Sequence, residues 1–455
     1  MVRKSKQVLR FDMPFTSEPP PMQSESLGLS RLMERGAARR TTDVTIIDSA
    51  DHRLLRAGVV LAHRVSDQTG EWYLSAPDWE PWLPAHHVEQ LGASVELPGS
   101  LAGRIRPISR RAVLGPVASQ QCEQTEYVLR GTDGDVLAEI HDKSVTLRRG
   151  GVTTARYREA TVVPLVSLTP SQREFILGSM ESAAATPVAR FPSLQQRLGP
   201  PATGLTDFPA PAELRKGSDM EDFVTALFSA DLQQLVEMLL EYHKAEEPDA
   251  VRLLKLLEHV RRDVRGLSPV MEPDWRAEVE ALTQPVQGES PRAVGERALD
   301  VVDALVVAVR APKLGDSSYA RARTLLFRRA ERAAFILADR CRALTPDASD
   351  ENWAAALLAC EQVLTTAEVG AQVFGKRGNR IVHQLQLMTE DLQACIAEPS
   401  TADPSQLDPQ EAYALGAAEE RRRAAVTGHR ERFVASWPGR VATLRGLLTK
   451  VQKKL

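Results

Sequence analysis

A chain of 455 residues is too long for one compact core and predicts two domains, because single cores stop growing at roughly 250–300 residues. Its hydrophobic content of 43% and charged content of 26% are ordinary for globular proteins and exclude global disorder. The formal net charge of −3 provides no overall attraction to nucleic acid or to an anionic membrane. Neither is therefore expected as a partner.

The four cysteines form no CxxC pair and are sparse for the length of the chain. This excludes a zinc ribbon or a disulfide framework and is typical of a reducing compartment. The basic N-terminus has no apolar core long enough for a signal peptide. The longest apolar run, Ala304–Val309, is far shorter than the ~20 residues that a membrane span needs. We therefore expect a soluble protein of the cytoplasm.

Residues 1–41 are polar and proline-rich, which predicts a mobile arm with one short helix near Leu29–Arg35. Residues 42–185 form a first domain of short runs rich in Val, Ile, Tyr and Thr, cut by Gly, Asp and Pro. The predicted strands are Val44–Ile47, Gly58–Val65, Glu71–Ser75, Ser94–Leu97, Glu126–Leu129, Val136–Asp142, Ser144–Arg148 and Ala155–Val163, with a helix over Ser171–Ala184. No helix alternates with these strands, so the sheet should be antiparallel.

The segment from Gly131 to Gly134 reads GTDG and predicts a hairpin between two of these strands. The chain contains no GxGxxG and no Walker sequence, so a nucleotide-binding αβ fold is not expected.

Residues 186–218 are rich in proline and glycine and predict a linker. Residues 219–455 have apolar residues three and four apart, which predicts helices. One helix begins at Asp219, and seven more are expected over 250–267, 275–283, 292–311, 318–344, 353–374, 380–397 and 409–450. Prolines fall between these segments or at their starts, where helices tolerate them. The sequence therefore predicts an α+β protein with a C-terminal helical bundle.

Two segments of the first domain resemble the CYTH family of triphosphate tunnel proteins. Asp48–Val65, which reads DSADHRLLRAGVVLAHRV, is similar to the strand–turn–strand signature of that family. Leu114–Val145, which reads LGPVASQQCEQTEYVLRGTDGDVLAEIHDKSV, is similar to its later hairpin segment. The resemblance implies an antiparallel β-barrel, or tunnel, in which basic side chains grip a triphosphate and carboxylates hold Mg²⁺ or Mn²⁺.

Most of the residues that such chemistry needs have no counterpart here. The opening strand of the family, which carries alternating glutamates, has no counterpart here. In later segments, the positions where the family has cations align with Ser75, Gln121, Glu123 and Gln124. The remaining candidates for a catalytic site are Arg64, Glu139, Asp142 and Glu159. Each also has a structural interpretation, as a solvated strand-face charge or, for Glu159, as the partner of Arg64 or Arg158. His86 and His87 are adjacent on a strand and should point to opposite faces, so they make a poor metal chelator.

The second domain resembles the CHAD family, whose helices bind polyphosphate through rows of basic residues. Asp249–Trp275, which reads DAVRLLKLLEHVRRDVRGLSPVMEPDW, is similar to the first basic helix of that family, and Tyr319–Leu337 stands where its second repeat belongs. The resemblance implies that a polyanion would contact Arg252, Lys255, His259, Arg262, Arg321 and Arg328. The alternative is a solvated helix surface with glutamate partners such as Glu258 and Glu331.

These patterns favour a divergent CYTH–CHAD protein that is non-catalytic and binds polyphosphate or another phosphate-rich polyanion. One alternative is an inorganic triphosphatase, for which Mg²⁺ or Mn²⁺ would be the cofactor. Another is a structural or scaffold protein without affinity for polyanions. The sequence does not indicate an oligomeric state.

Overall fold

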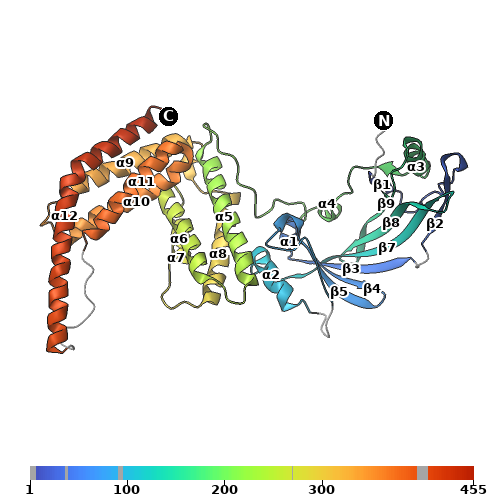
Figure 1. The fold of residues 1–455 in the computed structure, drawn as a ribbon, viewed down its shortest axis with the longest axis horizontal. Coiled ribbons are helices and arrows are strands. Elements are labelled where there is room, and N and C mark those ends of the chain that lie inside the picture. Colours follow the sequence, from blue (N-terminus) through green and yellow to red (C-terminus); the bar gives the residue numbers. More distant parts are fainter. Residues whose placement is uncertain (1–6, 36–38, 91–95, 269, 397–407) are drawn as a thin grey trace. The chain divides into compact units, whose positions relative to one another are not determined.

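The computed structural model describes residues 7–35, 39–90, 96–268, 270–396 and 408–455. The chain divides into two compact units. The β unit is Met1–Pro209 together with His243–Glu246, and the helical unit is Ala210–Tyr242 together with Glu247–Leu455. Figure 1 shows the antiparallel sheet in the first unit and the long helices in the second, which confirms the predicted α+β class.

The β unit contains one antiparallel sheet and four short helices. The strands are β1 Leu9–Met13, β2 Leu29–Glu34, β3 Arg40–Asp48, β4 Val60–Ser66, β5 Thr69–Ser75, β6 His86–Gln90, β7 Gly115–Gly131, β8 Val136–Arg149, β9 Val152–Pro164 and β10 Thr186–Pro187. The helices are α1 Arg53–Arg56, α2 Gly99–Ser109, α3 Pro170–Ser182 and α4 Leu194–Leu198. The strand order is β10-β1-β9-β8-β7-β3-β4-β5-β6, and β2 also pairs with β7.

The predicted closed barrel is not formed by the described strands. The path begins at β10 and ends at β6, and these two strands are not paired with each other. Closure requires a hydrogen-bonded ladder between the end strands, and β10 contributes only two residues to such a ladder. The β unit is therefore an open sheet in the part of the chain that the structure describes.

The centre of the sheet is made by the long strands β7, β8 and β9. The GTDG turn joins β7 to β8 as predicted, and Gly134 takes the left-handed conformation, with φ 83°, that such a tight turn requires. One apolar cluster joins Phe11 of β1 and Ile140 of β8 to Ile176 and Met180 of α3. Thr169 and Gln172 form a capping box that begins α3.

The predicted N-terminal arm is wrong over two segments. Leu9–Met13 forms β1 against β9, and Leu29–Glu34 forms β2 against β7 instead of the predicted helix. The physical reason is visible in β1, where Leu9, Phe11 and Met13 alternate with polar residues and are buried. Residues 1–6 and 36–38 of the predicted arm lie outside the described residues.

Several strand boundaries also differ from prediction. The strands expected over Val136–Asp142 and Ser144–Arg148 are one continuous strand, β8. Strand β6 and helix α2 were not predicted. Of the strand expected over Ser94–Leu97, residues 94 and 95 lie outside the described residues and the other two are not in a strand.

The helical unit contains all eight predicted long helices. They are α5 Met220–Lys244, α6 Ala250–Leu267, α7 Pro273–Thr283, α8 Pro291–Arg310, α9 Ala322–Arg342, α10 Asp350–Phe374, α11 Lys376–Ala394 and α12 Pro409–Gln452. Prolines at the first helical turn begin α7, α8 and α12. Within this unit α10 packs against α6, α9 and α11, and α12 packs against α9 and α11. Trp353 of α10 and Phe433 of α12 meet edge to face, with ring centroids 5.7 Å apart.

Among the described helices, α5 alone is long and apolar enough to cross a membrane. Two thirds of its most apolar stretch is buried inside the protein, as in the core helix of a globular domain. Helix α5 contains no long continuous apolar run, because polar residues alternate with its apolar ones along the sequence. The cytoplasmic location stays a prediction.

Helices α6 and α10 approach closely at Gly266. A Cβ atom at this position would lie 2.5 Å from Cγ2 of Val369 and 2.7 Å from the carbonyl oxygen of Thr365. Distances this short cannot be relieved by a side chain alone, because one of the two atoms belongs to the backbone of α10. The contact between α6 and α10 therefore depends on glycine at this position.

Gly266→Ala should destabilise the helical unit by about 1–3 kcal/mol, the usual cost of overpacking a well-packed interior. The measurement is thermal unfolding followed by circular dichroism. Gly446→Ala on α12 is the matched control, because a Cβ there meets nothing within 4 Å and alanine favours helix. An equal or higher Tm for Gly266→Ala than for Gly446→Ala would contradict the close approach.

Candidate functional site

The four catalytic candidates of the β unit are held in separate ion pairs. Nη1 of Arg64 lies 3.7 Å from Oε1 of Glu71, and the guanidinium group stacks on the ring of Tyr73 at 3.3 Å. Oε1 of Glu139 accepts a hydrogen bond of 2.7 Å from Nη1 of Arg35. Both groups are therefore neutralised by local partners.

Asp142 and Glu159 are paired in the same way with two further arginines. Nε of Arg158 donates to Oδ1 of Asp142 at 2.8 Å, and both side chains are buried. Nη2 of Arg197 donates to Oε1 of Glu159 at 3.0 Å, so the expected partners Arg64 and Arg158 are not the ones observed. Burial raises the pKa of Glu159, and Arg197 opposes that shift.

The register of the sheet also separates these carboxylates. Glu139 and Asp142 are three residues apart on the continuous strand β8, so their side chains point to opposite faces. Both residues also fall within the single predicted strand Val136–Asp142, so the sequence already indicates this parity. The structure therefore does not gather Arg64, Glu139, Asp142 and Glu159 into one cage.

A cavity of about 490 Å³ lies on one face of the sheet. Its charged lining consists of Arg40, Arg64, Lys143 and Glu71. Ser75 and Gln124, two positions where the resemblance expects cations, line the same cavity with neutral groups. Of these three cations, Arg40 lies 3.8 Å from Asp67 and Arg64 lies 3.7 Å from Glu71, so the cavity offers little unpaired positive charge for a metal triphosphate.

His86 and His87 are adjacent on β6, which is absent from the predicted strands, and they point to opposite faces as expected for neighbours in a strand. Nδ1 of His86 lies 3.0 Å from the hydroxyl of Tyr73, whereas Nε2 of His87 lies 3.8 Å from Oε2 of Glu89. The two rings therefore have different surroundings and do not converge.

In the helical unit, two of the predicted basic residues lie beside glutamates. Nη1 of Arg252 donates to Oε2 of Glu241 at 3.1 Å, and Nη1 of Arg262 lies 3.7 Å from Oε1 of Glu368. Lys255, Arg321 and Arg328 are exposed.

A different set of arginines surrounds a cavity of about 810 Å³ in the helical unit, which we call the basic pocket. Its charged lining residues are Arg265, Arg276, Arg329, Arg332, Glu280 and Glu361. They come from the C-terminal end of α6, from α7 and from facing sides of α9 and α10. Four guanidinium groups against two carboxylates make the lining basic in a chain whose net charge is negative.

Arg329 is the most unusual member of the basic pocket. Burial lowers its pKa to about 10, and its Nη1 atom is buried without a hydrogen-bond partner among the described residues. Arg265 and Arg276 share Glu280, which lies 3.6 Å from Nε of the former and 3.5 Å from Nε of the latter. The pocket therefore holds a buried guanidinium nitrogen without a partner among the described residues, beside two guanidinium groups oriented by a common carboxylate.

Only part of this pocket could be predicted from the sequence. Arg265 and Arg332 lie on faces that the basic pattern indicates, whereas Arg276 and Arg329 were not singled out. Leu325 lines the pocket one turn before Arg329. The available signal was the three- and four-residue spacing of 325, 329, 332 and 336 on α9, which includes Arg329 in place of Arg328.

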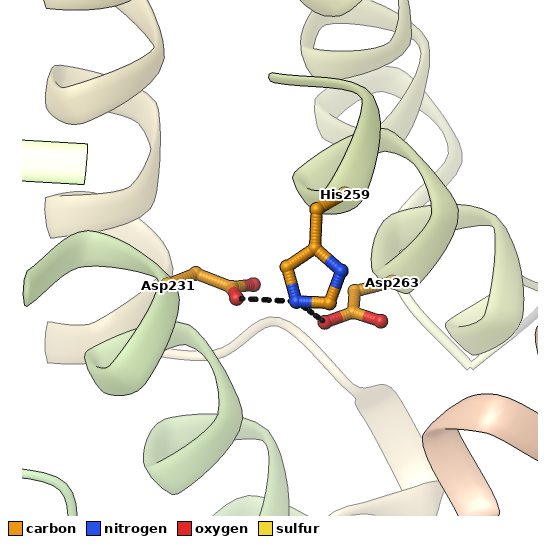
Figure 2. Close-up of side chains that lie close together, drawn as sticks. All are labelled: Asp231, His259 and Asp263. Atoms are coloured by element: carbon orange, nitrogen blue, oxygen red, sulfur yellow. Dashed lines mark ion pairs between the residues drawn. The ribbon is translucent and has the colours of Figure 1, made fainter. Parts of the chain in front are cut away.

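His259 lies between two aspartates rather than in a basic row. Figure 2 shows its ring facing Asp231 of α5 and Asp263 of α6, with Nε2 lying 3.7 Å from an oxygen of each. Burial raises the pKa of both carboxyls, that of Asp263 to about 7, and burial lowers the pKa of His259. Among the described residues, these three form the one group of at least three His, Cys, Asp or Glu side chains arranged to hold a metal ion.

Comparison with known proteins adds little to this geometry. No family model matches the chain, and no curated protein matches it. Among solved structures, the chain is similar to a "putative adenylate cyclase" from Bacillus halodurans, with 13% identity and a TM-score of 0.23. The match covers 34% of this chain and 81% of that one. A similarity of this size carries no argument about fold or activity.

Proposed function

We propose that this protein is a non-catalytic polyanion-binding protein that holds polyphosphate, or a similar phosphate-rich chain, in the basic pocket. The observation that carries the proposal is Arg329, a largely buried guanidinium group without a partner in a cavity lined by three further arginines. An anion would provide the hydrogen-bond acceptor and the opposite charge that Arg329 lacks.

The chemistry of the lining suits phosphate. Arginine presents five N–H donors in a planar fork that matches two oxygens of one phosphate group, and it stays charged at neutral pH. Glu280 orients Arg265 and Arg276, which leaves further donors of both side chains for a ligand. The volume of about 810 Å³ falls within the usual range for ligand sites.

The basic pocket lies apart from most of the basic residues that the CHAD resemblance implies as ligand contacts. Arg252 and Arg262 lie beside glutamates, His259 faces two aspartates, and Arg321 and Arg328 are exposed outside the pocket. Of the two positions, we favour the pocket because its four arginines line one cavity.

The ion pairs of the β unit support a binding role over hydrolysis. A metal triphosphate would have to separate Glu139 from Arg35 and Glu159 from Arg197 before it could use either carboxylate. We therefore propose no Mg²⁺ or Mn²⁺ cofactor for the β unit, which we regard as a divergent CYTH-like domain. Triphosphate hydrolysis remains the competing activity to test.

Arg332→Glu should lower the affinity for polyphosphate about tenfold or more, because it replaces a charge-assisted contact by a repulsion. Binding would be followed by the fluorescence anisotropy of labelled polyphosphate at 50 and 200 mM salt. If all four arginines contact phosphates, the wild-type affinity should fall about 50-fold between these salt concentrations, with the slope found for single-stranded nucleic acids.

Two variants on the same helix provide the controls. Arg342→Glu changes the net charge equally but lies at the far end of α9 outside the pocket, so its affinity should match the wild type. Arg328→Glu tests the predicted row. A loss in Arg328→Glu without a loss in Arg332→Glu would contradict the pocket, and undetectable binding at low salt would favour the scaffold alternative.

Asp142→Asn should destabilise the β unit by about 3–5 kcal/mol, because it leaves the guanidinium of Arg158 buried without its charge partner. Glu139→Gln should cost about 1 kcal/mol or less, because its partner Arg35 is exposed. Denaturant unfolding gives both values.

Hydrolysis of inorganic triphosphate with Mg²⁺ or Mn²⁺ completes this comparison. We expect background rates for the wild type and for Glu139→Gln and Glu159→Gln. Metal-dependent turnover that disappears in either variant would establish the triphosphatase and remove the non-catalytic interpretation.

A further inference from the structure

We propose that Asp231, His259 and Asp263 form a binding site for one divalent transition-metal ion, with Zn²⁺ as the expected occupant. The site lies between α5 and α6 of the helical unit (Figure 2). It is separate from the basic pocket, whose lining contains none of these three residues.

Helical spacing places two of the ligands. His259 and Asp263 are four residues apart on α6 and therefore lie on the same face, one turn apart. Two metal ligands at positions i and i+4 of one helix are a recurring arrangement in zinc sites. Asp231 reaches the same point from α5, so the three ligands come from two helices.

The distances are close to those of a coordinated ion. Nε2 of His259 lies 3.7 Å from Oδ1 of Asp231 and 3.7 Å from Oδ2 of Asp263, and the three ligand atoms lie within 4.8 Å of one another. Ligand atoms around tetrahedral zinc are about 3.4 Å apart, as follows from metal–ligand bonds of about 2.1 Å. Small side-chain rotations would therefore complete the coordination.

In the described part of the chain, one carboxylate oxygen of each aspartate lacks a hydrogen-bond partner, which favours a bound ion over a set of ion pairs that is already complete. Asp231 and Asp263 are only 2% and 4% exposed, yet Oδ2 of each has no hydrogen-bond partner among the described residues. Burying two neighbouring carboxyl groups is costly, and one histidine at 3.7 Å is a weak compensation for both. A divalent cation would satisfy both carboxylates at once.

The donor set and the surroundings indicate the class of metal. One imidazole nitrogen and two carboxylate oxygens suit Zn²⁺ better than Mg²⁺ or Ca²⁺, which prefer oxygen ligands alone. The side chain of His259 is 44% exposed, so an ion can enter from solvent and a water molecule can take the fourth position. Two further charged residues, Arg262 and Glu368, act on the cluster. They have opposite charges, and Nη1 of Arg262 lies 3.7 Å from Oε1 of Glu368.

The test is isothermal titration of the full chain with Zn²⁺ after treatment with a chelator. We expect one site per chain with a Kd of about 1 µM or below, and a loss of affinity of about 100-fold in His259→Gln and in Asp263→Asn. Saturating Zn²⁺ should raise the Tm of the wild type and not that of His259→Gln, because only the former binds the ion in its folded state. His383→Gln, which changes an exposed histidine on α11, should behave as the wild type.

Cobalt substitution identifies the ligand atoms directly. Co²⁺ bound at this site should show the weak absorption of nitrogen and oxygen ligation and no thiolate charge-transfer band, which separates the site from the buried cysteines. Saturable binding that His259→Gln and Asp263→Asn leave unchanged would overturn the proposal. A thiolate band, or no saturable Zn²⁺ binding to the wild type, would overturn it as well.

Discussion

A charged side chain that is removed from water needs an opposite charge or a ligand close by, and this constraint organises both units of the protein. In the β unit the requirement is met locally. Arg158 binds Asp142, Arg197 binds Glu159, and Asp207 lies against Arg56 and Arg110. In the helical unit the requirement is left open at Arg329 and at Asp231 with Asp263. This contrast between satisfied and unsatisfied buried charge is the basis on which we propose binding sites in the helical unit and not in the β unit.

The helical unit could be predicted well from sequence because its signals are local. Proline at the starts of α7, α8 and α12 and the three-and-four apolar spacing mark helices that the structure contains. The edges of the sheet were harder, because β1, β2 and β10 are short and acquire their partners from distant parts of the chain. A five-residue alternation such as that of β1 is a weak signal inside a proline-rich segment.

The candidate sites depend on tertiary packing that local sequence patterns do not determine. Which arginines of α9 face a cavity depends on how α9 packs against α10, and a rotation of the helix by one residue exchanges Arg328 for Arg329. The parity that separates Glu139 from Asp142, by contrast, was readable from sequence, because both residues fall within the predicted strand Val136–Asp142. His259 and Asp263 were within reach of the four-residue spacing, but Asp231 comes from another helix and needs the tertiary fold.

The close approach of α6 and α10 at Gly266 also fixes the width of the basic pocket. Arg265 precedes this glycine, and Thr365, whose carbonyl oxygen faces it, lines the pocket from α10. The α6 and α10 walls of the cavity are thus in direct contact, and this contact leaves no room for a methyl group at Gly266. A cavity held in this way is preorganised, so a ligand that fits loses little free energy to rearrangement of the walls.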